Sequence, residues 1–600
     1  MHRFLFYPNV ADGMGGGHLF RVFAMAEQLD APSAVVLPDE FQLPKQLESA
    51  GVQILRFNDH DFPAMNDGTA TVAVIDWRAA DTALFEHLGK DWYVVGLDDG
   101  GPLRQQMHYL ADITMAWLFP GTGNTILSPF PAVSGDVRDL IFPFRHIVIT
   151  FGSEDKAGLS RILVEKILAL KLFEPEAITV IEGPRYTQQH GEAADWPNGI
   201  EVFRNVKHLA NMLSRYDCVF THFGLTAFEA AAQGMPVILF NPTPYHRLLS
   251  RKAGFLEIGV KRPQAFKLKE FCSARYFFTE TRAEMIMEKT RLYDKTIPRL
   301  LEHFHPQGKP FCPVCGSMKK KIMARFPDRS YFQCQECMTI RMIRFSGETS
   351  AYSREYFFSE YRRQYGKTYL QDFEKIKGFG KSRTGLIQPL LAAIRPGGQD
   401  VQALDIGCAY GPFCSAAADA GWTITGLDIS TDAIDYVKHT LGFEAYVCDL
   451  EHEPLPVPVA EKQYDVLTMW YVLEHFVDVK TIVSLVHSLL GDNGIFAFST
   501  PNGNGISARR SLRQFLFESP ADHFTIWPAR NVKKALKKAG FTVKKIRITG
   551  HHPERFFSRD NYQPGTHRIL SRLICVVSKM FGLGDTFEVY AVKTGRRIND

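Results

Sequence analysis

Short apolar runs recur along the chain, and between them apolar residues return every three or four positions. Short runs are typical of strands buried in parallel sheets, and periodic stretches are typical of helices that cover those sheets. The predicted strands of the first 300 residues are Arg3–Tyr7, Ala34–Leu37, Thr71–Ile75, Tyr93–Leu97, His146–Thr150, Ala177–Ile181, Cys218–Thr221 and Val237–Phe240. The series restarts after the proline-marked stretch from Pro129 to Pro143, so we expect two successive Rossmann-like domains of α/β class.

A third series is centred on residues 401–430, which carry a strand from Val401 to Ile406, a glycine turn, an alanine-rich helix and a strand that ends at Asp428. Gly407 and Gly411 let the backbone of the turn approach a ligand at the carboxyl end of a strand. Asp428 follows Gly407 by 428 − 407 = 21 positions, where an acid can accept both hydroxyls of a ribose. The pattern predicts a nucleoside cofactor, with a tight turn that binds nothing as the alternative.

The spacing Asp405-x-Gly407-x-x-x-Gly411 differs from the G-x-G-x-x-G that holds a pyrophosphate, which disfavours a dinucleotide. The stretch resembles the first cofactor motif of class I S-adenosylmethionine-dependent methyltransferases. The likeness continues through YDVLTMW from Tyr464, VLEH from Val472 and GIFAFSTPN from Gly494. It implies a Rossmann-like methyltransferase domain that binds S-adenosylmethionine through Asp405, Gly407, Gly411, Asp428 and Asp449, with Asp449 at the adenine amino group.

Two histidines are candidate catalytic bases in this domain. His475 ends the VLEH segment, and His523 lies in DHFTIW, which resembles the H-[LF]-x-x-[FW] region near the substrate pocket of related methyltransferases. Methyl transfer is an in-line displacement, so a base is needed only if the nucleophile must lose a proton. For each histidine, a role as a structural hydrogen-bond partner is an equal alternative.

Four cysteines form the pattern C-x2-C-x18-C-x2-C. Thiolates on two short knuckles suit tetrahedral zinc, and four protein ligands leave no open position, so the predicted Zn²⁺ is structural. An iron site or four reduced thiols are the alternatives. Within the predicted ribbon, the basic run Lys319–Lys321 favours a solvated hairpin tip over a nucleic-acid contact. The predicted ligands are Cys312, Cys315, Cys334 and Cys337.

Two turns in the first 300 residues offer sites for anions. DGMGGGHLF, from Asp12, is a glycine loop that enters an amphipathic helix, with His18 at the entry. THFGLTAFEAAAQ, from Thr221, repeats the strand, turn and helix. Backbone N–H groups at a helix start can bind a phosphate. The candidate nucleotide-sugar-binding residues are Gly16, Gly17, Gly224, Thr226 and Glu229, and His18 is the candidate catalytic residue.

This pair of domains resembles the GT-B glycosyltransferase architecture. It is most similar to the UDP-sugar hydrolases of the pseudaminic acid pathway and to the N-acetylglucosaminyl transferase of peptidoglycan synthesis. The resemblance implies that His18 is a general base and that Glu229 binds the ribose of the nucleotide. Phe223 departs from the family, which has a small residue before the phosphate turn, and NPTPYH from Asn241 departs from its usual ending. The alternatives are that His18 is an exposed or helix-capping histidine and that Glu229 is a solvated helix residue.

The length of 600 residues predicts three or four domains. The net charge is only +4, which argues against a nucleic-acid partner, and no apolar run approaches the length of a membrane span. The run from Ile569 to Phe581 is too short to cross a bilayer, which leaves peripheral membrane contact open. We expect a cytoplasmic protein. The predicted domains are 1–140 and 141–305 (the GT-B-like halves), 306–345 (zinc ribbon), 346–390 (helical connector) and 391–600 (methyltransferase).

A cysteine ribbon followed by a methyltransferase resembles bacterial enzymes of sugar and glycan pathways. We therefore expect a methyltransferase that acts on a sugar, nucleotide sugar or surface glycan, fused to a module for glycosyl transfer or UDP-sugar hydrolysis. One alternative is that the amino-terminal module binds a glycan or nucleotide sugar without catalysis. Another is an RNA methyltransferase with the ribbon as its recognition module.

Overall fold

The computed structural model describes residues 2–10, 17–48, 51–56, 70–77, 82–86, 88–112, 119, 121–126, 141–152, 154–183, 186, 196–204, 206, 209–273, 301–345, 366–394, 400–556 and 568–594. The chain divides into two compact units, Met1–Phe304 (unit 1) and His305–Asp600 (unit 2), and each is described by itself. Gly16 and residues 346–365 of the predicted connector lie outside the described residues.

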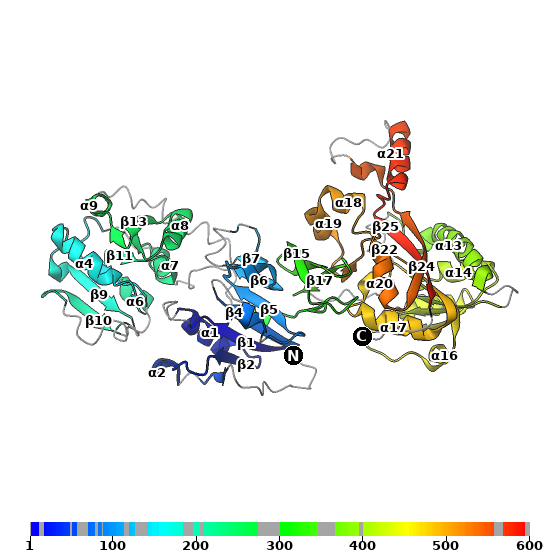
Figure 1. The fold of residues 1–600 in the computed structure, drawn as a ribbon, viewed down its shortest axis with the longest axis horizontal. Coiled ribbons are helices and arrows are strands. Elements are labelled where there is room, and N and C mark those ends of the chain that lie inside the picture. Colours follow the sequence, from blue (N-terminus) through cyan, green and yellow to red (C-terminus); the bar gives the residue numbers. More distant parts are fainter. Residues whose placement is uncertain are drawn as a thin grey trace. The chain divides into compact units, whose positions relative to one another are not determined.

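The first sheet of unit 1 has seven parallel strands in the order β3-β2-β1-β4-β5-β6-β7 (Figure 1). Its strands are β1 His2–Pro8, β2 Ser33–Leu37, β3 Gln53–Arg56, β4 Ala70–Asp76, β5 Tyr93–Leu97, β6 Tyr109–Asp112 and β7 Thr125–Ile126. Its described helices are α1 Gly17–Gln28, α2 Lys45–Glu48, α3 Thr82–Glu86 and the 3-10 turn η1 Pro102–Gln105. The four strands predicted here are confirmed, and the sheet is doubly wound.

The second sheet of unit 1 has the order β10-β9-β8-β11-β12-β13-β14, parallel except for β14 at its edge. Its strands are β8 Ile147–Ile149, β9 Ile178–Glu182, β10 Glu201–Arg204, β11 Cys218–Thr221, β12 Val237–Asn241, β13 Leu256–Val260 and β14 Arg262–Pro263. Its described helices are α4 Leu159–Ala169, η3 Pro175–Ala177, α6 Leu209–Leu213, α7 Leu225–Ala232, α8 Pro244–Ala253 and α9 Ala265–Ser273. Here too the four predicted strands are present.

The large sheet of unit 2 has the order β20-β19-β18-β21-β22-β25-β24, in which β25 runs antiparallel to both neighbours. Its strands are β18 Gln402–Ile406, β19 Thr423–Asp428, β20 Glu444–Val447, β21 Tyr464–Trp470, β22 Leu490–Pro501, β24 Phe541–Thr549 and β25 Thr586–Lys593. The chain order reverses between β18 and β21. Open α/β sheets bind ligands at such a switch point, beyond the carboxyl ends of the strands.

The helices of unit 2 cover both faces of this sheet (Figure 1). Helix α13 passes through residue 390, where the sequence places the end of the connector. No helix among the described residues is long and apolar enough to cross a membrane. The described helices are η6 Leu370–Asp372, α13 Phe373–Ile394, α14 Pro412–Asp419, α15 Thr431–His439, α16 Val457–Ala460, η7 Leu473–His475, α17 Val479–Leu489, α18 Ile506–Arg510, α19 Leu512–Glu518, α20 Val532–Lys538, η8 Pro553–Phe556 and α21 Arg568–Met580.

A second, antiparallel sheet of unit 2 joins the cysteine segment to the large domain. It has the order β15-β16-β17-β23, from β15 Lys320–Arg325, β16 Arg329–Cys334, β17 Ile340–Arg344 and β23 Thr525–Ile526. The last strand comes from a loop about 180 residues later in the chain, directly after His523. The prediction of a solvated tip is wrong for Lys320, because this residue begins β15, is buried and lies over the ring of Phe332.

Candidate functional site

The turn after β18 requires its glycines for close packing within the protein. Gly407 and Gly411 have φ angles of +72° and +77°, a region that L side chains rarely adopt. A Cβ at Gly407 would lie 2.2 Å from Val472, and one at Gly411 would lie 2.8 Å from Leu441. Packing against side chains that follow β21 and α15 thus accounts for both glycines, and the close approach of this backbone to a ligand stays a prediction.

The turn lies against the acid that ends β19. Asp428 Oδ2 accepts a hydrogen bond from the backbone N–H of Ala409 at 2.8 Å, and Oδ1 accepts one from Ser430 at 2.9 Å. Burial raises the pKa of Asp428, against these backbone donors. A carboxylate has about four lone-pair sites, so Asp428 retains acceptor capacity for hydroxyl groups. The predicted neighbourhood of turn and acid is therefore present.

The other two predicted cofactor acids have different surroundings. Asp405 is buried beneath the turn, where Thr468 Oγ1 donates to its Oδ1 at 2.6 Å, and burial raises its pKa to about 7. Asp449 is partly exposed beyond β20. Its Oδ1 accepts from Glu451 N at 3.0 Å and its Oδ2 lies 2.8 Å from His452 Nδ1. Asp449 is thus held by its own loop, and any ligand would share its oxygens with these donors.

Beyond the carboxyl end of β21, both candidate catalytic histidines of unit 2 come together. The rings of His475 and His523 meet edge to face with their centroids 4.7 Å apart. His475 Nδ1 lies 3.2 Å from Asp522 Oδ2. A carboxylate in this position fixes the tautomer of a histidine and stabilises its protonated form. The structure therefore adds Asp522 to the predicted pair.

The surrounding residues shift the pKa values of His475 and His523 in opposite directions. Burial by itself lowers the pKa of His475, but its hydrogen bond to the Asp522 carboxylate and the charges of Glu474 and Asp522 outweigh burial, so the pKa is raised. Burial lowers the pKa of His523 to about 3, with a further contribution from His475. His523 therefore stays neutral near pH 7, which makes His475 the better candidate base.

A third buried acid lies at the same place. Glu474 is fully buried, and neither of its carboxylate oxygens makes a hydrogen bond within the described part of the chain. Burial raises its pKa to about 7. One ligand atom from each of Glu474, His475 and His523 lies within 4.8 Å of the others, so these side chains could also hold a divalent cation. An unpaired buried carboxylate is costly, which makes it a marker of a functional site.

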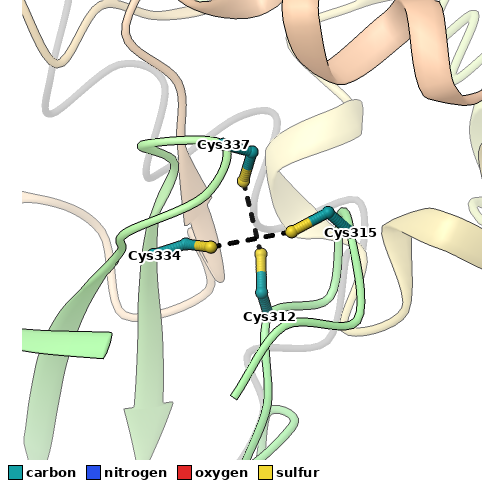
Figure 2. A group of neighbouring side chains, drawn as sticks. All are labelled: Cys312, Cys315, Cys334 and Cys337. Carbon is teal, nitrogen blue, oxygen red and sulfur yellow. Dashed lines mark hydrogen bonds between the residues drawn. The ribbon is translucent and has the colours of Figure 1, made fainter. Parts of the chain in front are cut away.

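The four predicted metal ligands gather at one point (Figure 2). Cys312 Sγ lies 3.5 Å from Cys337 Sγ, and Cys315 Sγ lies 3.6 Å from Cys334 Sγ, far beyond a disulfide bond. A zinc ion with Zn–S bonds of about 2.3 Å places tetrahedral ligands about 3.8 Å apart. The sulfur positions therefore fit a tetrahedral metal site.

The cysteine segment is packed into the large domain. Three of its cysteines belong to the same apolar core as α17, β21 and β22, and the backbone N–H of Lys480 donates to Pro313 O at 2.7 Å. The pairing of Ile340 with Ile526 then connects this segment to the strand that follows His523. The cysteine cluster thus supports one wall of the histidine site.

In unit 1, His18 is buried in the first turn of α1, which disagrees with the alternative of an exposed histidine. Its Nδ1 lies 2.7 Å from Oδ1 of Asp76, the last residue of β4. Arg21 Nε donates to Asp76 Oδ2 at 2.7 Å, and Arg21 Nη2 donates to Oδ1. Although burial opposes ionisation, the charges of Arg21 and His18 lower the pKa of Asp76. Gly17 begins the helix.

The second predicted turn of unit 1 follows β11. Gly224 precedes α7, Thr226 lies in its first turn, and burial raises the pKa of Glu229 one turn further. Phe223 is fully buried, with its ring centroid 5.6 Å from that of Phe228. Its bulk therefore points into the core, whereas the ring of His222 lies 3.3 Å from the Cβ position of Gly224 in the turn. The sequence did not single out His222. Its Nε2 lies 3.4 Å from the position that a Cβ would occupy at Gly152, in the turn after β8.

Comparisons with known proteins concern unit 2. Residues 379–546 match the family model described as "Methyltransferase domain". These residues form a class I S-adenosylmethionine-dependent methyltransferase domain. The "Ubiquinone biosynthesis O-methyltransferase" of Bordetella avium is 30% identical over 137 residues, which are 22% of this chain and 54% of that protein. Its Klebsiella pneumoniae counterpart is 35% identical over 105 residues, 17% and 43% of the two chains.

Among solved structures, a SAM dependent methyltransferase from Archaeoglobus fulgidus is 17% identical with a TM-score of 0.28, over 40% of this chain and all of that one. The chain spans about half the length of the curated relatives it matches.

Three acids of the sites were missed by sequence reasoning. Asp76 directly follows the predicted strand Thr71–Ile75 and is the last residue of β4, a position at which an acid can be suspected. Asp522 and Glu474 each directly precede a predicted histidine. Only this adjacency signalled them, since burial and pairing depend on contacts between distant segments.

Proposed function

We propose that this chain methylates a sugar, nucleotide sugar or glycan with S-adenosylmethionine, and that unit 1 binds and processes a nucleotide sugar. The observation that carries the methyl transfer is the pair His475–Asp522 in the matched domain, where His475 lies three residues after Val472, which packs at Gly407. The sugar acceptor is supported by the fusion to two doubly wound sheets, in which α1 and α7 begin where the sequence predicts anion-binding turns. This second argument is one of association.

When bound, S-adenosylmethionine supplies an electrophilic methyl group on a positively charged sulfur. Asp428 is suited to the ribose hydroxyls, and the turn Gly407–Gly411 lies against it. Among the described residues, Asp405 and Glu474 are buried carboxylates without a cationic partner in hydrogen-bonding contact, so a cationic cofactor would stabilise their ionised forms. The acids of this site therefore fit a sulfonium cofactor.

In the proposed reaction, His475 takes the proton of an acceptor hydroxyl while the oxygen bonds to the methyl carbon. The carbon–sulfur bond breaks, and its electron pair goes to sulfur. Because Nδ1 of His475 faces Asp522, we propose that Nε2 accepts the proton of the acceptor hydroxyl. Asp522 stabilises the resulting imidazolium, and neutral His523 packs against the ring and holds its orientation.

The cysteine cluster is proposed to hold structural zinc. Its four sulfurs fill a tetrahedral set and leave no position for substrate. In unit 1, we propose that Glu229 binds the ribose of a nucleotide sugar and that His18, oriented by Asp76, acts as a base on water or a sugar hydroxyl. The starts of α1 and α7 would stabilise the diphosphate.

Calorimetric titration of the full chain with S-adenosylhomocysteine and with UDP tests both sites. Asp428→Ala should abolish binding of the first ligand alone, and Glu229→Ala binding of UDP alone. Asp432→Ala and Glu270→Ala, which remove exposed acids in the same units, are the matched controls. Binding of S-adenosylhomocysteine without UDP would reject the nucleotide-sugar role of unit 1. Failure to bind S-adenosylhomocysteine would reject the methyltransferase.

A further inference from the structure

Helix α21 has its apolar side turned away from the protein. Leu573, Val576, Val577 and Met580 are between 43% and 74% exposed, and Phe581 directly after the helix is 63% exposed. The opposite side carries Ser578, which is 1% exposed and whose Oγ lies 2.7 Å from His551 Nδ1. A helix that packs on a protein core normally shows the reverse arrangement. This face therefore requires a partner outside the described chain.

Most charged residues beside this face are basic, while η8 also carries exposed Glu554 and α19 exposed Glu518. The sequence of α21, RILSRLICVVSKM, contains three basic residues and no acid, and Arg572 and Lys579 are exposed. The 3-10 turn η8 contacts both α21 and α18, and α18 with α19 adds exposed Arg509, Arg510 and Arg513. Cations next to an exposed apolar stripe complement a surface that is apolar inside and anionic at its boundary.

The dimensions of the helix exclude a spanning role. Its 13 residues extend about 20 Å, which is short of the roughly 30 Å hydrocarbon core of a bilayer. A short helix with one apolar face and flanking cations instead suits a position in the plane of the membrane interface. Figure 1 shows α21, in red, projecting from the body of unit 2.

We propose that α21 binds the full chain to the surface of an anionic lipid bilayer. The helix leads into β25, whose first residue, Thr586, pairs with Pro501 at the carboxyl end of β22. Membrane binding through α21 therefore brings the carboxyl edge of the methyltransferase sheet to the lipid surface. A lipid-linked acceptor follows from this placement, and that part of the inference rests on the proposed methyl transfer.

Co-sedimentation of the full chain with vesicles tests the proposal. Phosphatidylglycerol mixed with phosphatidylcholine should bind the protein, and phosphatidylcholine alone should bind it at least ten-fold more weakly. The double variant Leu573→Ser/Met580→Ser should weaken binding at least ten-fold. Arg572→Gln and Lys579→Gln should each weaken it about five-fold, with less effect at high salt. Phe266→Ser, which removes an exposed aromatic from α9 of unit 1, is the matched control.

Two results would overturn the inference. One is equal binding of wild type and the double variant to anionic vesicles. The other is a dimer in light scattering that the double variant converts to a monomer without any vesicle binding by wild type, since a second copy would then cover the face. Titration with S-adenosylhomocysteine separates this test from the proposed reaction, because the variants at exposed positions should retain cofactor binding.

Discussion

Asp76 in unit 1 and Glu474 in unit 2 are both fully buried acids at the carboxyl ends of parallel strands, yet their pKa values move in opposite directions. Burial favours the neutral form of each. Arg21 and His18 contact Asp76 and lower its pKa, whereas the carboxylate of Glu474 has no hydrogen-bonding partner among the residues that the structure describes, and burial raises its pKa to about 7. Unit 1 therefore neutralises the charge of Asp76 internally.

Unit 2 leaves several anionic groups for outside partners. Glu474 and Asp405 both have a pKa of about 7, and four cysteine sulfurs meet at one point. A sulfonium cofactor and a zinc ion are cations that would compensate these groups. Unit 2 should therefore gain more stability from its ligands than unit 1 does.

The largest effect is expected from removal of the cysteine-bound metal. Cys334→Ser or a strong chelator should unfold the ribbon, because a structural zinc site contributes about 10 kcal/mol in small domains. Since β17 pairs with β23, methyl transfer should fall at least 100-fold. Zinc content, circular dichroism and turnover measure the change. Cys448→Ser removes a buried thiol outside the cluster and should retain the metal. Full activity without metal would contradict the role.

Replacement of Asp76 should destabilise unit 1. Asp76→Ala leaves Arg21 and His18 without their shared carboxylate, and breaking such a buried pair costs about 3–5 kcal/mol. Urea unfolding monitored in unit 1 measures the loss, and Glu27→Ala on the exposed side of α1 should change stability by less than about 0.5 kcal/mol. A loss equal to that of the control would show that the pair is not structural.

Glu474→Gln should change how stability depends on pH. The folded protein holds the Glu474 proton more tightly than the unfolded chain, so its contribution is full below pH 4.5 and is lost as the pH rises to about 7. Between pH 5 and 8, wild type should therefore lose about 2–3 kcal/mol more than the variant. Glu588→Gln is the contrasting control, because Arg547 and Arg383 lower the pKa of Glu588. If the free energy of unfolding had the same pH dependence in wild type and Glu474→Gln, burial would not raise the pKa of Glu474.

The smallest effect is a shift in the pH dependence of turnover. Activity should rise as His475 loses its proton, and Asp522 raises the pKa of His475. Asp522→Asn should therefore move the ascending limb of kcat to lower pH and reduce its plateau. His523→Asn should leave the position of the limb nearly unchanged, since His523 is neutral over this range. An unshifted limb in Asp522→Asn would remove His475 as the base.

The sequence alone determined the local elements and the residue types of the sites. The eight strands predicted in unit 1 exist because short apolar runs bounded by turn residues can bury both faces only in a covered sheet. The glycines at 407 and 411 were identifiable because their backbone angles exclude other residues. The cysteine spacing identified four sulfurs that the fold brings within 4.8 Å.

Only the tertiary structure decided which residues act together. His18 and Asp76 are 58 positions apart, His475 and His523 are 48 apart, and neither pairing has a signal in local periodicity. The pairing of β23 with β17 depends on which strand edge remains uncovered once the sheets have packed. The exposed apolar face of α21 likewise depends on that packing. Burial then sets the charge of each acid, because the loss of water and the approach of a cation are properties of the assembled fold.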